Sequence, residues 1–238
     1  PVPMKASTPC ASCAPESAGD PLAKLWILSD RHLETVLYPD QFRSEPPAFD
    51  LLVAAGDMWE ADPRQTFRVL RRLANDEPVV FVMGNHEHWH DIVPADLARA
   101  QILAGCRFVG TTLRGDCRLA GQLDPNPPTG KPIDVAHDGG HHLLTVGDAA
   151  ALHRHARAEL AALMDEGDGA LPLIGVTHHA PHPDCIAPAW RGTWNAGSLT
   201  LDLSALTDTG RAGLRKNGHV HHSPDLARPG ATRFLAAP

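Results

Sequence analysis

Five short segments of the sequence carry side chains of the kinds that bind metal ions. They read SDRHLE around Asp30 and His32, AAGDMWE around Asp57, VMGNHEHWH around Asn85 and His86, GVTHHAPHP around His178, and NGHVHHS around His219 and His221. Imidazole nitrogens mixed with carboxylate and amide oxygens suit Mn, Fe, Co, Ni or Zn, whereas calcium prefers an all-oxygen shell. Each segment alone is commonplace, but the ordered set predicts one shared metal site.

Four of these segments follow short apolar runs that end abruptly in polar residues. Such runs are typical of buried strands, and they predict strands over 25–29, 51–55, 79–83 and 173–177. Ligands of α/β sheets bind at the carboxyl ends of the strands. The segments are therefore expected to meet at one edge of the fold.

Helical periodicity lies between the predicted strands. It predicts one helix from Pro63 to Asn75, with Pro63 in its first turn, and another from Asp148 to Asp165, with Asp148 as its N-cap. Strands alternating with helices indicate the α/β class. We expect a flexible extension over residues 1–24 and a single domain over 25–238. The stretch from 115 to 147 is rich in Gly and Pro, which predicts a long surface excursion.

Composition excludes several classes of protein. The 238 residues hold 15 histidines, a high number that is consistent with a metal site. The net charge of −7 argues against general binding to long nucleic acid. No apolar run approaches the ~18 residues of a membrane span, so no membrane association is expected. Five cysteines form no framework spacing, and the lone Cys10-x-x-Cys13 has no second pair, which favours a reducing cytoplasm.

The five segments, taken in order, resemble the pattern of the calcineurin-like metallophosphoesterase family. That pattern runs D-x-H, G-D, G-N-H-[DE], a histidine after a strand, and G-H-x-H. The resemblance spans about Leu25 to Ala237 and is nearest to small bacterial members of unassigned substrate. It implies a four-layer α/β/β/α sandwich of two mixed sheets flanked by helices.

The resemblance also implies two divalent metal ions and the residues that hold them. Their identity among Mn, Fe, Zn, Co and Ni stays open. Asp57 would bridge the pair, since a carboxylate has two oxygens and can hold two cations ~3.5–4 Å apart. The implied ligands are Asp30, His32, Asp57 and His221 for one metal, and Asp57, Asn85, His178 and His219 for the other.

The implied reaction is hydrolysis of a phosphomonoester or phosphodiester by a hydroxide that bridges the metals. His86 would stabilise the phosphoryl group and protonate the leaving oxygen. His178 follows its strand directly and is favoured as the ligand over His179. A small phosphoester is the expected substrate, and the sequence does not indicate an oligomeric state.

Two departures from the family pattern support an alternative. Arg31 replaces the usual apolar residue between Asp30 and His32, and its guanidinium could reach a substrate phosphate or point outward. Leu214 to Asn217 is more polar than a buried strand, which argues against tight packing beside His219. The alternative is a catalytically weak or inactive metal-binding scaffold or regulatory protein of the same fold. A Ser or Cys hydrolase has little support, because G-x-S-x-G is missing from the sequence.

Overall fold

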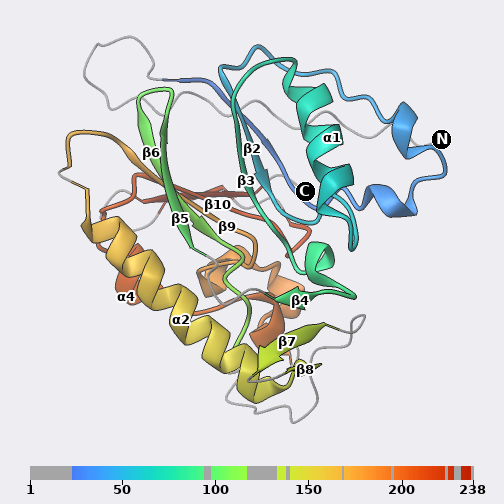
Figure 1. The fold of residues 1–238 in the computed structure, drawn as a ribbon. Helices are drawn as coiled ribbons and strands as arrows, with labels where there is room; N and C mark the ends of the chain where they lie inside the picture. The colour runs from blue at the N-terminus through green and yellow to red at the C-terminus, as the bar shows by residue number, and fades with distance from the viewer. Residues whose placement is uncertain are drawn as a thin grey trace.

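The computed structural model (Figure 1) describes residues 23–93, 98–116, 133–137, 140–167, 169–193, 196–222, 225–227 and 232–236. The predicted flexible extension lies outside these residues apart from 23 and 24, and so does the Cys10-x-x-Cys13 pair. Much of the predicted excursion over 115–147 also lies outside them. The extension and the Cys10-x-x-Cys13 pair therefore stay predictions, and the excursion can be compared with the structure only over 115–116, 133–137 and 140–147.

Three parallel strands form the first sheet in the order β1-β2-β3. Leu25 lies opposite Leu51, and Leu52 lies opposite Val79. β1 and β2 are buried along their whole length, which explains why their sequences are continuously apolar rather than alternating. The bounds are β1 Leu25–Leu28, β2 Leu51–Ala55 and β3 Val79–Val82.

Six strands form the second sheet in the order β11-β12-β10-β9-β6-β5. Its four central strands run parallel, and the strands at both edges run antiparallel to their neighbours. Of the two large sheets, this one is mixed and the first is parallel in the part of the chain that the structure describes, whereas two mixed sheets were expected. The bounds are β5 Arg99–Leu103, β6 Cys106–Thr111, β9 Leu173–Thr177, β10 Leu214–Asn217, β11 Asp225–Ala227 and β12 Arg233–Ala236.

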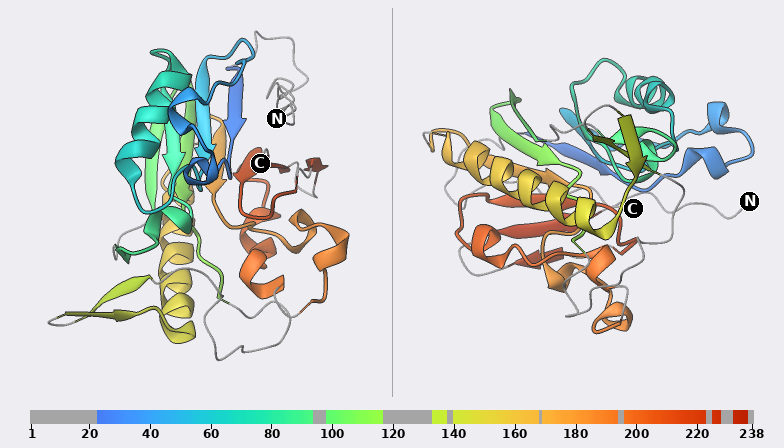
Figure 2. Two further views of the ribbon diagram at one scale, coloured as in Figure 1. Left: turned by 90° about the vertical axis from the view of Figure 1, so that its right-hand side faces the viewer. Right: turned by 60° about the horizontal axis from the view of Figure 1, so that its bottom comes forward.

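The two sheets pack face to face, and a helix covers the outer face of each (Figures 1 and 2). A shared core joins Ile27 and Val53 of the first sheet to Phe108, Ile174 and Val176 of the second. Helix α1 (Pro63–Ala74) packs on the other face of the first sheet, and helix α2 (Val146–Asp165) packs on the second. The predicted α/β architecture is confirmed.

Helix α2 begins earlier than the sequence predicted. Its N-cap is Thr145, and Asp148, which was expected to be the cap, occupies the third helical position. The Asp148 carboxylate accepts the Thr145 backbone N–H at 2.9 Å, and the Thr145 hydroxyl accepts the Asp148 N–H at 3.2 Å. This capping box satisfies two donors of the first turn. Helix α1 begins as predicted, with Pro63 after its N-cap, Asp62.

Strand β10 corrects the expectation drawn from its polar sequence. All four of its residues are buried, and it lies in the middle of the second sheet between β9 and β12. The Arg215 stem covers Gly175, whose missing side chain leaves room for it, and the guanidinium donates to the Leu206 carbonyl at 3.4 Å. The strand before His219 is therefore buried and regularly paired, although Arg215 Nε and Nη1 and Asn217 Oδ1 are buried without a hydrogen-bond partner.

Part of the predicted excursion is regular structure. β7 pairs with β8 in antiparallel orientation and with β4 in parallel orientation, which makes a third, small sheet at the bottom of Figure 1. No helix of the described residues is long and apolar enough to cross a membrane. The remaining bounds are β4 Ile92–Val93, β7 Asp134–His137, β8 Gly140–Leu143, α3 Ala196–Leu199, α4 Ser204–Thr207, and 3₁₀ turns η1 Leu33–Thr35, η2 Pro39–Gln41, η3 His86–His88, η4 Pro183–Cys185 and η5 Pro188–Trp190.

Candidate metal centre

The seven predicted metal ligands come together where strands of both sheets end. Each lies in the loop after β1, β2, β3, β9 or β10, so five separate loops build the cluster. Six of the seven form two groups of potential metal ligands, and the seventh, Asn85, contacts the second group. The predicted convergence at the carboxyl edge of the strands is what the structure has.

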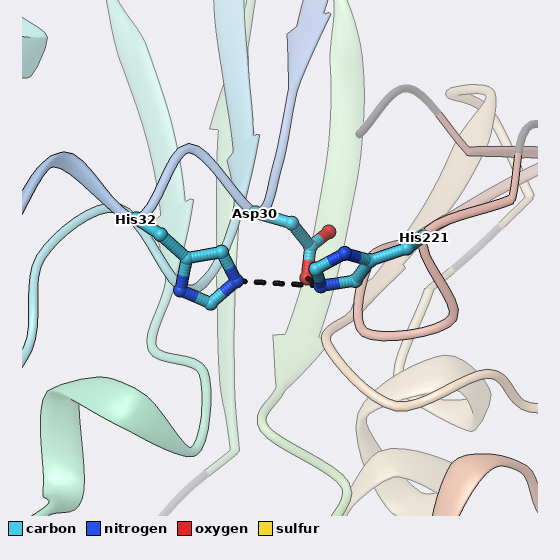
Figure 3. A group of neighbouring side chains, drawn as sticks. All are labelled: Asp30, His32 and His221. Atoms are coloured by element: carbon cyan, nitrogen blue, oxygen red, sulfur yellow. Dashed lines mark hydrogen bonds and ion pairs between the residues drawn. The ribbon is translucent and has the colours of Figure 1, made fainter. Parts of the chain in front are cut away.

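The first group consists of Asp30, His32 and His221 (Figure 3). The Nε2 atoms of His32 and His221 lie 3.3 Å apart, and His221 Nε2 lies 3.5 Å from Asp30 Oδ1. Asp30 Oδ2 is buried and has no hydrogen-bond partner. Two imidazole nitrogens and a carboxylate that converge on one point fit a divalent cation, since a cation satisfies all of them at once.

The second group consists of Asp57, His178 and His219, with Asn85 beside them. His178 Nε2 lies 3.3 Å from Asp57 Oδ2 and 2.9 Å from Asn85 Oδ1. Asp57 Oδ2 is also 4.0 Å from His32 Nε2, so this carboxylate lies between the two groups. One group of potential ligands therefore lies on each side of this carboxylate.

Backbone carbonyls fix which nitrogen of two rings faces the centre. His178 Nδ1 donates to the Ala55 carbonyl at 2.8 Å, which leaves Nε2 for a metal. His219 Nε2 donates to the Ser198 carbonyl at 3.2 Å, which leaves Nδ1. A carbonyl only accepts, so each of these nitrogens must carry the proton. Opposite nitrogens of the two rings are therefore presented to the centre.

The loops that carry the ligands have a strained backbone. Asp30, His32, Asp57, His219 and His221 all have positive φ, between 44° and 63°. Non-glycine residues seldom adopt this region, and such strain clusters at functional sites.

The loops also approach one another too closely for side chains at two glycines. Gly56 has φ of 86°, and a Cβ on it would lie 2.5 Å from His178 Nδ1. A Cβ on Gly84 would lie 2.0 Å from Asp57 Oδ1. The G-D and G-N-H motifs therefore need their glycines for space.

Asp57 and His178 perturb each other strongly. Burial alone would lower the pKa of His178, but the Asp57 carboxylate raises it to about 9. Burial would raise the pKa of Asp57, and His178 holds it well below its usual range. The protein thus stabilises a positive charge at His178 Nε2, where a metal ion would replace the proton.

His86 lies beside the centre, as predicted for the catalytic residue. Its Nε2 is 3.8 Å from Asp57 Oδ2, and its backbone N–H donates to Asp57 Oδ1 at 2.9 Å. Its ring packs between those of His32 and Trp89, with centroid distances of 4.3 and 3.5 Å. The Glu34 carboxylate lies 3.6 Å from its Nδ1.

His179 contacts the second group but does not belong to it. Its Nδ1 donates to the Thr112 carbonyl at 3.2 Å, and its ring packs on His219 with a centroid distance of 4.1 Å. Burial and the neighbouring His219 hold the pKa of His179 well below its usual value. The geometry therefore favours His178 over its neighbour as the ligand.

Arg31, which stands between Asp30 and His32, is partly buried. Burial lowers the pKa of its guanidinium, and the Asp30 carboxylate opposes this effect.

Three residues near the centre, Glu34, Arg114 and Glu87, had no role assigned from the sequence. Glu34 could not be assigned from the sequence, because a carboxylate two residues after His32 belongs to no motif. Arg114 is buried beside the cluster, and its Nε and Nη2 have no hydrogen-bond partner. Burial lowers its pKa to about 10, against the opposing effect of Asp57. Glu87 belongs to the G-N-H-E motif, which was its only signal.

Glu87 clamps the β2 loop to the β3 loop. It is fully buried and accepts the backbone N–H groups of Asp57 at 2.9 Å, Met58 at 2.7 Å and Gly84 at 2.7 Å. It also accepts from Trp59 N at 3.3 Å. Burial and the Asp57 charge raise the pKa of Glu87. One side chain thereby holds the backbone on both sides of the candidate centre.

Fold and site together define a metal-dependent phosphoester hydrolase. The model of the calcineurin-like phosphoesterase family matches residues 23–223. The chain belongs to this family, as its five motifs predicted. No curated protein matches it.

The solved structures that the chain resembles have distant sequences. The phosphopantetheinyl hydrolase of Mycobacterium tuberculosis is 19% identical with a TM-score of 0.58, over 89% of this chain and 87% of that one. A dimetal phosphatase from Danio rerio is 16% identical with a TM-score of 0.46, over 79% and 71%. A hypothetical protein from Thermus thermophilus is 14% identical with a TM-score of 0.43, over 90% and 75%. At these identities the first likeness supports the fold alone.

Proposed function

We propose that the protein is a dinuclear hydrolase of small phosphoesters whose two divalent metals are held by the seven clustered residues. The single observation that carries the proposal is the position of Asp57 between the two groups of ligands, 4.0 Å from His32 and 3.3 Å from His178. The mixed nitrogen and oxygen donors favour Mn, Fe, Zn, Co or Ni. The proposed ligands are Asp30, His32, Asp57, Asn85, His178, His219 and His221.

The charge of the centre supports an anionic substrate. Two divalent cations bring +4 and the carboxylates of Asp30 and Asp57 bring −2, so about +2 remains. This local surplus attracts a phosphate group although the whole chain carries −7. Bound divalent cations would also lower the pKa of a water molecule and so supply the nucleophile.

His86 is proposed to serve the leaving group. Its Nε2 faces the same space as Asp57 Oδ2, at 3.8 Å, while its Nδ1 faces away toward Glu34. An imidazolium in this place can donate its Nε2 proton to the departing oxygen. Poor leaving groups depend most on such a donor.

The test measures metal content and hydrolysis for the wild type and three variants. Asp57→Asn is expected to lose both metals and all turnover, since a neutral amide bridges two cations poorly. His86→Ala is expected to keep both metals and to lose most turnover, more for alkyl than for nitrophenyl esters. Asp40→Asn, at an exposed carboxylate, is the matched control. Full activity of Asp57→Asn would refute the assignment of the centre.

The substrate panel should contain monoesters, diesters and a phosphopantetheinyl diester, with several added metals. The last compound is suggested by the name of the structurally similar hydrolase from Mycobacterium tuberculosis. The alternative of an inactive scaffold loses one of its two motives, because the polar strand β10 is fully buried and regularly paired. Retained metals without hydrolysis of any ester would restore that alternative.

A further inference from the structure

Glu34 lies between the rings of two residues of the proposed site. It belongs to the 3₁₀ turn η1, directly after His32. Its Oε1 lies 3.4 Å from His32 Nδ1 and 3.6 Å from His86 Nδ1. Its Oε2 accepts the backbone N–H of Glu60 at 3.2 Å. One oxygen therefore anchors the carboxylate, and the other faces both imidazoles.

Both rings turn their other nitrogen toward the candidate centre. His32 Nε2 is 3.3 Å from His221 Nε2, and His86 Nε2 is 3.8 Å from Asp57 Oδ2. Glu34 thus lies on the far side of both rings from the two proposed metal sites, where a carboxylate can orient the rings. Glu34, His32 and His86 also form a third group of converging potential ligands, so metal binding by the Glu34 carboxylate itself is the competing role that the tests below separate. A carboxylate behind a metal-binding histidine fixes both its tautomer and its orientation.

Two buried atoms of this arrangement lack partners. Neither Glu34 Oε1 nor His86 Nδ1 makes a hydrogen bond, although both are buried. A buried polar atom without a hydrogen-bond partner destabilises the folded protein. Their separation of 3.6 Å exceeds an ordinary N–H···O distance of about 2.9 Å by less than 1 Å. A small rotation of either side chain therefore pairs them.

We propose that Glu34 is a positioning residue whose carboxylate accepts a hydrogen bond from the Nδ1–H group of His32 and another from the Nδ1–H group of His86. It presents His32 Nε2 to a metal and His86 Nε2 to the leaving group, and it joins the two by one carboxylate. When His86 donates its Nε2 proton to the leaving oxygen, the ring that remains is the neutral Nδ1–H form that Glu34 binds. The inference rests on the proposed function for its catalytic consequence, whereas the geometry of the rings is independent of it.

The first test needs no catalysis. Nitrogen-15 NMR of the metal-free protein, at a pH where the rings are neutral, reports which nitrogen of His86 carries the proton. The wild type is expected to show Nδ1–H, and Glu34→Leu and Glu34→Ala are expected to show a mixture of both forms. Glu34→Gln keeps an acceptor oxygen and should retain Nδ1–H. An Nε2–H form of His86 in the wild type would overturn the inference without any variant.

The second test compares metal binding and leaving groups. Calorimetric titration with Mn²⁺ should show one site weakened about 10–100-fold in Glu34→Leu and little changed in Glu34→Gln. Hydrolysis should fall more for alkyl esters than for nitrophenyl esters. Glu45→Ala, at an exposed carboxylate, is the matched control. Wild-type tautomer, metal affinity and leaving-group dependence in a folded Glu34→Leu variant would overturn the role of Glu34.

The two proposals fail in different ways. If Asp57→Asn keeps full activity, the proposed function fails, yet the NMR measurement still decides whether Glu34 orients His86. If Asp57→Asn is inactive and the His86 tautomer does not depend on Glu34, only the present inference fails.

Discussion

Glu87→Gln tests whether one buried carboxylate holds the candidate centre in shape. Each oxygen of Glu87 accepts two backbone N–H groups. Oε1 accepts from Met58 and Trp59, and Oε2 accepts from Asp57 and Gly84. A glutamine of the same size can supply only one oxygen. In either orientation its amide group faces two backbone N–H donors that then have no acceptor.

The expected loss follows from this count. Each buried donor left unpaired costs about 1–3 kcal/mol, so two cost about 2–6 kcal/mol. Burying the charged Glu87 carboxylate also has a cost, which shows in its raised pKa, and glutamine avoids that cost. The expected loss of unfolding free energy therefore lies in the lower half of this range, at about 2–4 kcal/mol. For a chain of this length the melting temperature falls by about 2–4 °C per kcal/mol, which predicts a fall of roughly 5–15 °C.

The assay is thermal unfolding of the metal-free protein followed by circular dichroism, together with a Mn²⁺ titration. The titration should show weaker binding, because the backbone of Asp57 loses one of its anchors. Glu77→Gln, at an exposed position after α1, is the matched control. A melting temperature within about 1 °C of the wild type, with unchanged Mn²⁺ affinity, would show that the clamp contributes nothing.

Three further predictions concern space, buried charge and helix capping. Gly84→Ala should abolish metal binding in calorimetry, because its Cβ would lie 2.0 Å from Asp57 Oδ1, whereas Gly213→Ala, with nothing within 4 Å, should bind normally. Arg114→Leu should raise the urea midpoint of the metal-free protein by the equivalent of about 1–3 kcal/mol, since Nε and Nη2 lack partners; a lower midpoint would contradict this. Asp148→Ala removes the acceptor of the Thr145 backbone N–H and should cost about 1 kcal/mol at pH 7. Burial would raise the pKa of Asp148, but Thr145 lowers it, so this stability is present above the unfolded pKa of about 3.9 and disappears as pH falls through the lower folded pKa. Urea unfolding at pH 7 and at pH 3 checks this, and a pH-independent difference would contradict it.

The strands that carry the site were predictable because their signals are local. Leu51 to Ala55 is apolar at every position, and the structure buries all of it as β2. Strand β10 shows where this reasoning stops. Arg215 and Lys216 read as exposed, but the space over Gly175, a residue of another strand, lets the Arg215 stem pack inside. Composition within one segment cannot report such room.

The start of α2 shows a second limit. Asp148 has the right chemistry for an N-cap, and so does Thr145 three residues earlier. The structure uses both, with Thr145 as the cap and Asp148 reaching back to it. Apolar periodicity does not distinguish the two starts, because both residues precede the first buried positions of the helix, Ala149 and Ala150.

The sequence by itself determined the donors of the site and their order, because each motif is a few residues long and follows its own apolar run. Only the tertiary structure decided which ring nitrogen faces the centre, since carbonyls from distant segments make that choice, such as Ala55 for His178 across 123 residues. It also decided that Glu34 and Glu87 belong to the site. Each has a partner from another loop, His86 for Glu34 and Asp57 for Glu87, and contacts between loops depend on the packing of the chain, which no local pattern specifies.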